Sequence, residues 1–367
     1  MASSASLIGL PKTALETPAL LVDLDLMEAN IVRIAGTCRR HGVDWRPHIK
    51  GHKTPEIARR QLAAGAIGVT CAKLGEAEVM ADAGITEILI ANQIVGPSKM
   101  DRLRHLLQRA PVIVSVDSLA NIAELADGTA GGRHELRLVV EVNIGMDRAG
   151  VAPGSPAVVL ADAIARQQGL RFVGVTGWES HAVTIADPDE KARVVAEAVA
   201  LLAGSAEACR RAGHDVRIVS CGGTGTFPSC VRQPGVTEVQ VGGAIFSDVH
   251  YRTHYHLDHP CALKLLTTVT SRPTTRRIVL DAGKKAMSGD AALPEPLGLA
   301  NVRSLRLSAE HTTIELDAPS ETPRVGDQLE LIVGYSDTTV HLHEEIVGLR
   351  AGSVDAVWRV AARGRIK

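Results

Sequence analysis

The stretch IGVTCAKLGEAEVMADAGITEILIAN, residues 67–92, contains one complete strand–helix–strand unit. Two short apolar runs, IGVTCAK (67–73) and EILIAN (87–92), flank the segment GEAEVMADAG. The apolar residues of that segment recur at helical spacing, and it ends on glycine, a common helix stop. This order and spacing are typical of a parallel βαβ unit, whose two strands lie in one sheet. The stretch therefore predicts an α/β fold.

The same alternation recurs along the chain between about residues 18 and 250. Each apolar, β-branched run is followed by an amphipathic segment rich in alanine, leucine and arginine. About eight such units fit a (β/α)8 barrel better than an open doubly wound sheet, and no GxGxxG follows the first run to indicate a dinucleotide-binding fold. The predicted strands are ALLVDLD (19–25), VDWRPHIK (43–50), IGVTCAK (67–73), EILIAN (87–92), VIVSVDS (112–118), LRLVVEVNIG (136–145), RFVGVTGWESH (171–181), VRIVSCGG (216–223) and EVQVGGAIFSD (238–248).

After residue 260 the helical periodicity stops. The remaining sequence is rich in valine, threonine and isoleucine, and turn-forming stretches such as APSETPRVGD (318–327) interrupt it. This pattern predicts an all-β domain of about 100 residues. The predicted organisation is a barrel over residues 18–255, followed by a β domain over residues 256–367 against which residues 1–17 pack.

Composition and charge exclude several classes of function. The 367 residues carry a formal net charge of −1, so no general positive field attracts nucleic acid or anionic lipid. No uninterrupted apolar stretch reaches the roughly 20 residues of a membrane helix, and the N-terminus does not resemble a secretory signal. The six cysteines form no CxxC pair, which is typical of reduced thiols in a cytosolic protein. We therefore expect a cytoplasmic protein that binds neither nucleic acid nor membrane.

Two glycine-rich turns follow the last two predicted barrel strands. In SCGGTGTF (220–227) and QVGGAIF (240–246), backbone N–H groups stand free of large side chains and are able to bind a phosphate. Active sites of these barrels lie at the C-terminal ends of the strands, and phosphate commonly binds after the last two. Such glycines also serve turn geometry alone, but two adjacent glycine-rich turns favour a phosphate site.

A cluster of cations ends the second predicted strand, in WRPHIKGHKTPE (45–56). On an extended strand Arg46, His48 and Lys50 share one side, which we expect to face the barrel mouth. Desolvation there favours the neutral amine that forms a Schiff base, whereas Lys53 lies beyond it, at the start of the next helix. A strand-end lysine alone is more often half of an ion pair. Opposite a phosphate site, it indicates chemistry with pyridoxal phosphate or a sugar phosphate.

Six stretches, in collinear order, resemble the fold-type III pyridoxal-phosphate enzymes, and more narrowly the D-threonine aldolase/D-serine dehydratase family. They are TPALLVDLDLMEANI, RPHIKGHKTPEIA, GVTCAKLGEAEVMADAGI, EVNIGMDRAGV, SCGGTGTF and QVGGAIFSD. The resemblance implies that Lys50 holds pyridoxal 5'-phosphate as a Schiff base, with His48 in a supporting catalytic role. It also implies a homodimer in which the β domain closes the site across the interface. The cofactor contacts that it implies are Arg148, Trp178, Gly222, Gly223, Thr224, Gly225, Gly242 and Gly243.

The second motif of this family, a short metal site near the C-terminus, is altered here. Relatives read P-x-H-x-D-P-T-x-N, whereas this chain reads VGYSDTTVH (333–341). Asp337 keeps the acidic ligand, while Tyr335 replaces the histidine and His341 replaces an asparagine. If the segment is a strand, these side chains share one face, and Asp337 with His341 holds Mn²⁺, Mg²⁺ or Zn²⁺. The alternative is that no metal binds and that Tyr335 or His341 does the acid–base chemistry.

The resemblance implies an aldolase that cleaves the Cα–Cβ bond of a D-3-hydroxy amino acid to glycine, or a related amino acid, and an aldehyde. The alternatives are a dehydratase that releases a 2-oxo acid and ammonia, an amino-acid racemase, and a non-catalytic pyridoxal-phosphate carrier. Asp337 favours the aldolase over the dehydratase, because dehydratases of the family carry cysteine at this position. The β domain argues against the carrier, since such carriers resemble the isolated barrel.

Two further polar stretches leave alternatives open. The run HYRTHYHLDH (250–259) contains four histidines, but ordinary linker polarity explains it better than a metal site. Whether Tyr251 or Tyr255 touches the phosphate is not decided by the sequence. Glu179 and His181, at the end of the seventh predicted strand, either line the substrate pocket or pair with each other.

Overall fold

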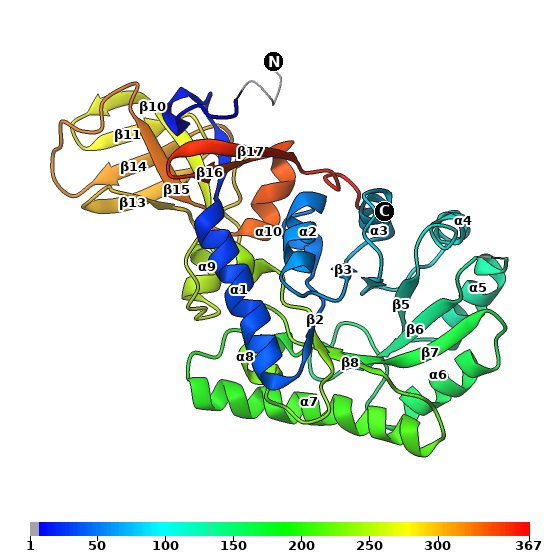
Figure 1. Cartoon of the computed structure of the whole chain (residues 1–367). Helices are drawn as coiled ribbons and strands as arrows, with labels where there is room; N and C mark the ends of the chain where they lie inside the picture. Colours follow the sequence, from blue (N-terminus) through cyan, green and yellow to red (C-terminus); the bar gives the residue numbers. More distant parts are fainter. Residues whose placement is uncertain (1–6, 132) are drawn as a thin grey trace.

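The computed structural model describes residues 7–131 and 133–367, which form a barrel and a second, mainly antiparallel sheet (Figure 1). The barrel strands are all parallel and run in the order β2-β9-β8-β7-β6-β5-β4-β3. A parallel bridge between His48 and Thr70 joins the two end strands and so closes the sheet. The strands are β2 (Asp44–Trp45), β3 (Val69–Cys71), β4 (Ile88–Ile90), β5 (Val112–Val116), β6 (Leu136–Glu141), β7 (Leu170–Thr176), β8 (Ile218–Cys221) and β9 (Glu238–Val239).

Helices alternate with these strands and lie on the outside of the barrel (Figure 1). Several begin where the sequence supplies a capping side chain: Asp23, Ser118 and Asp187 accept N–H groups at the starts of α1, α5 and α7. Within the described ranges, no helix combines the length and the apolar character needed to cross a membrane. The helices are α1 (Leu24–His41), α2 (Pro55–Ala63), α3 (Leu74–Asp82), α4 (Pro97–Leu106), α5 (Leu119–Thr129), α6 (Ser155–Ala165), α7 (Pro188–Arg211), α8 (Phe227–Cys230) and α9 (Val249–Thr253), with 3-10 turns η3 (Ile49–Gly51), η4 (Ser180–Ala182) and η5 (Gly243–Ile245).

The second sheet contains the C-terminal part of the chain, which confirms the predicted architecture of a (β/α)8 barrel followed by a β domain. Residues of the N-terminal segment lie against it, since the N–H groups of Gly9 and Lys12 donate to Val354 and Gly352. The elements are η2 (Lys12–Ala14), β1 (Ala19–Asp23), β10 (Leu263–Thr274), β11 (Arg277–Leu280), β12 (Glu295–Pro296), β13 (Val302–Leu307), β14 (Thr312–Leu316), β15 (Gln328–Ile332), α10 (Ser336–Thr339), η6 (Val340–Leu342), β16 (Glu345–Arg350) and β17 (Ser353–Arg359).

The first predicted barrel strand, residues 19–25, does not belong to the barrel. β1 pairs antiparallel with β10 and parallel with β16, so it is a central strand of the β-domain sheet, and the barrel sheet begins only at β2. A short apolar run predicts a buried strand but carries no information about which sheet it joins. The helix that follows, α1, then passes from this sheet to the barrel (Figure 1).

The second predicted strand, residues 43–50, is also shorter than expected. Only Asp44 and Trp45 pair with β9 as a regular strand, although the N–H groups of Arg46 and His48 still donate to Val239 and Gln240. The chain then enters the turn η3, where the Nδ1 atom of His48 accepts the N–H of Lys50 at 3.3 Å. Lys50 therefore projects from a 3-10 turn at the end of the strand.

The interior of the barrel contains an ion pair beneath this turn. Arg46 and Glu238 are buried, and the guanidinium donates to both carboxylate oxygens, with NH2 to Oε2 at 3.0 Å. Ser220 adds a hydroxyl donor to Glu238 at 2.9 Å. Arg46 does share a side with His48, as predicted, but it lies inside the barrel with Glu238. The expectation that Arg46 faces the mouth is wrong. The alternation of side chains along a strand predicts which face of the sheet a residue is on, but not how far below the barrel mouth it lies.

Candidate active site

A cavity of about 360 Å³ opens at the carboxyl ends of the barrel strands, a volume within the usual range of small-molecule sites, about 300–1,000 Å³. Its walls come from the residues that follow β2, β3, β4, β7, β8 and β9 and from the end of β6, and the segment 335–337 of the β domain covers one side. The predicted site residues in its lining are His48, Lys50, Arg148, Trp178, Gly222, Gly223, Thr224, Gly242, Gly243, Tyr335 and Asp337.

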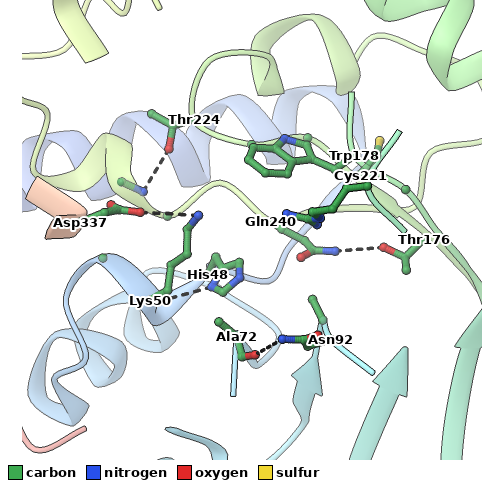
Figure 2. Close-up of a pocket in the computed structure, with 18 of the residues that line it drawn as sticks. His48, Lys50, Ala72, Asn92, Thr176, Trp178, Cys221, Thr224, Gln240 and Asp337 are labelled. Carbon is green, nitrogen blue, oxygen red and sulfur yellow. Dashed lines mark hydrogen bonds and ion pairs between the residues drawn. The ribbon is translucent and has the colours of Figure 1, made fainter. Parts of the chain in front are cut away.

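Lys50 points into this cavity from η3, toward Asp337 (Figure 2). Its Nζ atom lies 3.6 Å from Oδ2 of Asp337 and 5.4 Å from the centre of the Trp178 ring. Burial lowers the pKa of His48 well below its usual value, so its imidazole is neutral and is available to accept the Lys50 N–H. Lys53 instead pairs with the buried Glu76, away from the cavity. Lys50 is therefore the lysine that a cofactor or substrate in the cavity meets.

The two glycine-rich turns form a cradle with free donors. Within the described residues, the N–H groups of Thr224, Gly225 and Gly242 donate to no protein acceptor, although Gly225 itself is not part of the cavity wall. The N–H of Gly243 donates to Oγ1 of Thr224 at 3.1 Å, which ties the two turns together. A Cβ on Gly242 would approach the carbonyl oxygen of His48 to 2.0 Å, so only glycine allows this close backbone contact.

Trp178 and Arg148 form another part of the cavity wall. The guanidinium of Arg148 lies 5.6 Å above the Trp178 ring and 3.9 Å from the carboxylate of Glu141. The indole Nε1–H of Trp178 is buried without a partner, which leaves one donor for a bound molecule. A cavity with a lysine amine, a cradle of N–H groups and an unpaired indole fits pyridoxal phosphate, whose aldehyde, phosphate and ring need these contacts.

Several polar residues of the cavity are absent from the sequence prediction. Gln240 donates to Thr176 at 3.2 Å and to Ser220 at 2.9 Å, and Gln93 donates to Glu141 at 2.6 Å. Burial raises the pKa of Glu141. Each of these residues lies at or near the end of a barrel strand, where the active sites of such barrels lie, and that position along the chain is the signal that points to them.

The altered metal motif does not form the predicted strand. Residues 336–339 and 340–342 are the helical turns α10 and η6, because the buried carboxylate of Asp248 accepts the Ser336 N–H at 2.7 Å and fixes the start of the turn. Tyr335 and Asp337 line the cavity, whereas His341 is exposed and is not part of the cavity wall. The structure therefore does not bring His341 into the cavity wall with Asp337, and their pairing in a metal site stays a prediction.

Tyr251, which sequence reasoning left undecided, contacts this segment directly. Its hydroxyl donates to Oδ1 of Asp337 at 3.0 Å, and its N–H donates to Asp248 at 2.7 Å. Burial raises the pKa of Asp248 to about 7, and burial together with the charge of Asp337 raises the pKa of Tyr335. Tyr335 packs edge-on against Tyr251, with ring centres 5.5 Å apart. The helix α9 and the segment 335–337 thus form one unit beside Lys50.

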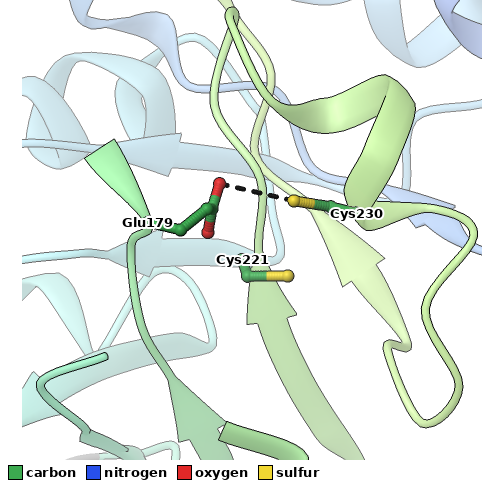
Figure 3. A group of neighbouring side chains, drawn as sticks. All are labelled: Glu179, Cys221 and Cys230. Atoms are coloured by element: carbon green, nitrogen blue, oxygen red, sulfur yellow. Dashed lines mark hydrogen bonds between the residues drawn. The ribbon is translucent and has the colours of Figure 1, made fainter. Parts of the chain in front are cut away.

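Glu179 points toward Cys230, with Cys221 at the end of β8 close by (Figure 3). It is fully buried and accepts hydrogen bonds from Thr226 Oγ1 at 2.5 Å, Cys230 Sγ at 3.4 Å and the Gly222 N–H at 3.4 Å. Cys221 completes a group with metal-ligand atoms, but burial raises the pKa of Cys230 well above its usual value, which keeps that thiol protonated. Glu179 neither lines the cavity nor pairs with His181, which were the two expectations for it. It holds the turn after β8 instead, and His181 is exposed.

We expect a Glu179→Gln substitution to lower the affinity for pyridoxal phosphate by about 10-fold, because an amide cannot accept from all three donors that hold the turn. Titration of the apoprotein with the cofactor, followed by absorbance, measures this change. Glu124→Gln is the matched control, since Glu124 also accepts a loop N–H, that of Gly96, but Gly96, unlike Gly222, is not part of the cavity wall. Equal affinities for the two variants would contradict the supporting role of Glu179.

Comparison with known proteins gives concordant matches over both parts of the chain. Residues 22–249 match the model of the alanine racemase N-terminal domain, and residues 262–349 match that of a putative serine dehydratase domain. The chain is 32% identical over 360 residues to D-threonine aldolase of Arthrobacter sp, which covers 97% of this chain and 95% of the relative. It is 33% identical over 370 residues to 3-hydroxy-D-aspartate aldolase of Paracoccus denitrificans (strain Pd 1222), and this match covers 98% of this chain and 95% of the relative. The crystal structure of D-threonine aldolase from Filomicrobium marinum superposes with a TM-score of 0.94 at 36% identity, covering 98% of this chain and 99% of the other.

Proposed function

The chain belongs to the D-threonine aldolase/D-serine dehydratase family of fold-type III pyridoxal-phosphate enzymes, and on that premise we propose that it is an aldolase for D-3-hydroxy amino acids. It cleaves the Cα–Cβ bond to give glycine, or a related amino acid, and an aldehyde. The observation that carries this function is the pair formed by the Lys50 amine and the Asp337 carboxylate in the cavity, whose wall also includes the cradle of N–H groups. The similarity to two aldolases over nearly the whole chain supports it.

The residues that would hold the cofactor surround Lys50. Lys50 would bind its aldehyde carbon, the N–H groups of Thr224 and Gly242 would bind its phosphate, and Trp178 would contact its ring. When bound, pyridoxal phosphate supplies an electron sink for the pair released at Cα. Arg148 offers positive charge at the opposite end of the cavity, within reach of an anionic oxygen.

His48 acts in this proposal as a positioning residue. Its Nδ1 atom holds the backbone of Lys50, and because its imidazole is neutral it adds no second positive charge beside the amine. The β-hydroxyl of the substrate would lie near the segment 335–337, which is the part of the cavity wall supplied by the β domain. Lys50 and this segment together can then act on Cα and on the β-hydroxyl from neighbouring positions.

The finer parts of the proposal concern assembly and location. We infer a homodimer in which each site is completed across the interface, since the family resemblance implies one, and size-exclusion chromatography with light scattering tests it. All six cysteines are free and five of them are buried, which supports a reducing, cytoplasmic environment. The substrate is a small D-amino acid, and the net charge of −1 gives no reason to expect nucleic acid as a partner.

Product analysis of the cofactor-loaded protein tests the reaction class. We expect D-threonine to yield acetaldehyde and glycine, measured with an aldehyde-coupled assay and amino-acid chromatography. A 2-oxo acid with ammonia, from D-threonine or D-serine, would instead establish the dehydratase, and an L-amino acid would establish the racemase. If the protein binds the cofactor but does not turn over D-3-hydroxy amino acids, it is instead a non-catalytic pyridoxal-phosphate carrier.

A further inference from the structure

Each oxygen of the carboxylate beside Lys50 has a partner in the protein. One oxygen of Asp337 faces the Lys50 ammonium at 3.6 Å, and the other accepts the Tyr251 hydroxyl at 3.0 Å. The backbone of Gly51 approaches so closely that a Cβ there would lie 2.7 Å from Oδ1. In the cofactor-free chain a divalent cation on this carboxylate would have to displace the Lys50 amine from Oδ2, and it would compete with the Tyr251 hydroxyl for Oδ1.

Among the described residues of the cavity wall, the other groups near Asp337 are poor metal ligands. The position two residues before it, where the family motif has histidine, is Tyr335, and a neutral phenol binds divalent ions far less well than an imidazole. The imidazole of His250 packs against the Tyr335 ring, with centres 5.0 Å apart, and is not part of the cavity wall. Among the described residues that line the cavity, the other carboxylate is Glu141, which engages Gln93 and Arg148. The donor set around Asp337 does not fit the metal that the family motif implies.

We propose that this site works without a divalent metal, and that Asp337 takes the proton of the substrate's β-hydroxyl while Tyr335 donates a hydrogen bond to the same oxygen. The inference rests on the proposed aldolase function and names the groups that act in it. Tyr251 positions Asp337 through its hydroxyl, and Asp248 holds both parts of this arrangement by accepting the N–H groups of Tyr251 and Ser336.

The step balances within the site. The O–H bond of the β-hydroxyl breaks, its proton passes to Asp337, and the oxygen pair forms the C=O bond of the aldehyde. The Cα–Cβ bond breaks, and its electron pair goes to the sink described above. Cα then gains one proton, from the Lys50 ammonium or from water, so that the proton lost by the hydroxyl equals the proton gained by carbon. No oxidant, reductant or metal enters the balance.

Metal binding tests the first half of the proposal without requiring turnover. We expect the purified holoenzyme to contain no stoichiometric Mn²⁺, Mg²⁺ or Zn²⁺ by elemental analysis, and to bind no Mn²⁺ in calorimetric titration. A Tyr335→His variant regains the His-x-Asp pattern of the family and is expected to bind Mn²⁺ stoichiometrically. Mn²⁺ binding by the unaltered protein, or none by Tyr335→His, would contradict the role given to Tyr335.

Chelation then connects metal to the reaction. The rate of D-threonine cleavage should be the same after EDTA treatment and after addition of Mn²⁺. A rate that falls with chelator and returns with Mn²⁺ would overturn the metal-independent site while leaving the aldolase function intact. Production of no aldehyde under either condition would overturn the aldolase function, and the binding experiment would still decide the question of the metal.

Substitution of the two acting groups tests the second half. Asp337→Asn is expected to lower kcat by about 100-fold or more, the usual contribution of a general base, and Tyr335→Phe by roughly 10-fold or more, through loss of one donor to the reacting oxygen. Both variants should keep the absorbance of the bound cofactor. Asp258→Asn, an exposed carboxylate near α9, is the control and should keep the full rate. Asp337→Asn with an unchanged kcat would exclude Asp337 as the proton acceptor.

Discussion

A Lys50→Ala variant reconstituted with pyridoxal phosphate is expected to lose the absorbance band of a lysine-bound cofactor and to lower kcat/KM for D-threonine by roughly 10⁴–10⁶-fold, the usual effect of removing a covalent catalytic group. Lys50 is the lysine of the cavity wall, and its amine faces Asp337 and the Trp178 ring. Without it, the cofactor has no amine to bind covalently.

Lys53 provides the matched control for this experiment. It lies three positions further along the same cationic stretch, but its amine pairs with Glu76 outside the cavity. We expect Lys53→Met to be less stable, because Glu76 is fully buried and loses its ion-pair partner, but to keep the cofactor band. Borohydride reduction of the unaltered holoenzyme, followed by peptide mass spectrometry, should place the cofactor on the peptide that contains Lys50. A label on Lys53 would contradict the assignment.

Much of the fold could be predicted because hydrophobic periodicity is a local property. The strand–helix alternation of residues 67–92 recurs often enough to require a barrel, and the rule that active sites lie at strand ends then brings Lys50 and the glycine-rich turns together. The prediction reaches individual residues where one segment decides them, as with Lys50, which the cationic stretch 45–56 places in the cavity wall.

The rest depends on contacts between segments far apart in the chain. The apolar run of β1 predicts a buried strand but does not predict which strands it pairs with, so the sequence assigns it to the barrel. Its actual place between β10 and β16 depends on pairing with strands far away in the chain. The turn at residues 336–342 is helical because a carboxylate 88 residues earlier, Asp248, accepts the Ser336 N–H. Tyr251 lies in a histidine-rich stretch that looks like a linker, and only the fold brings its hydroxyl to Asp337.

The second large effect is expected in stability rather than chemistry. Arg46→Ala should lower the free energy of unfolding by about 3–5 kcal/mol, the usual cost of leaving one partner of a buried ion pair alone. The side chains of Arg46 and Glu238 are 5% and 3% exposed, and the guanidinium also donates to the carbonyl oxygen of Glu87 at 2.8 Å. Its removal leaves a buried carboxylate with the Ser220 hydroxyl as its remaining side-chain donor nearby.

Urea unfolding at saturating cofactor measures this loss, because ligand binding then contributes equally to each variant. The double variant Arg46→Met/Glu238→Leu should lose much less than Arg46→Ala, since it removes both charges and keeps apolar volume. Arg193→Ala, which breaks an exposed pair with Glu197 on α7, should cost less than about 1 kcal/mol. The same experiments decide where Arg46 acts. If Arg46 lay in the barrel mouth, its removal would lower the cofactor affinity and leave the unfolding midpoint nearly unchanged. Because it lies inside the barrel, we expect its removal to lower the unfolding midpoint and to leave the cofactor affinity nearly unchanged.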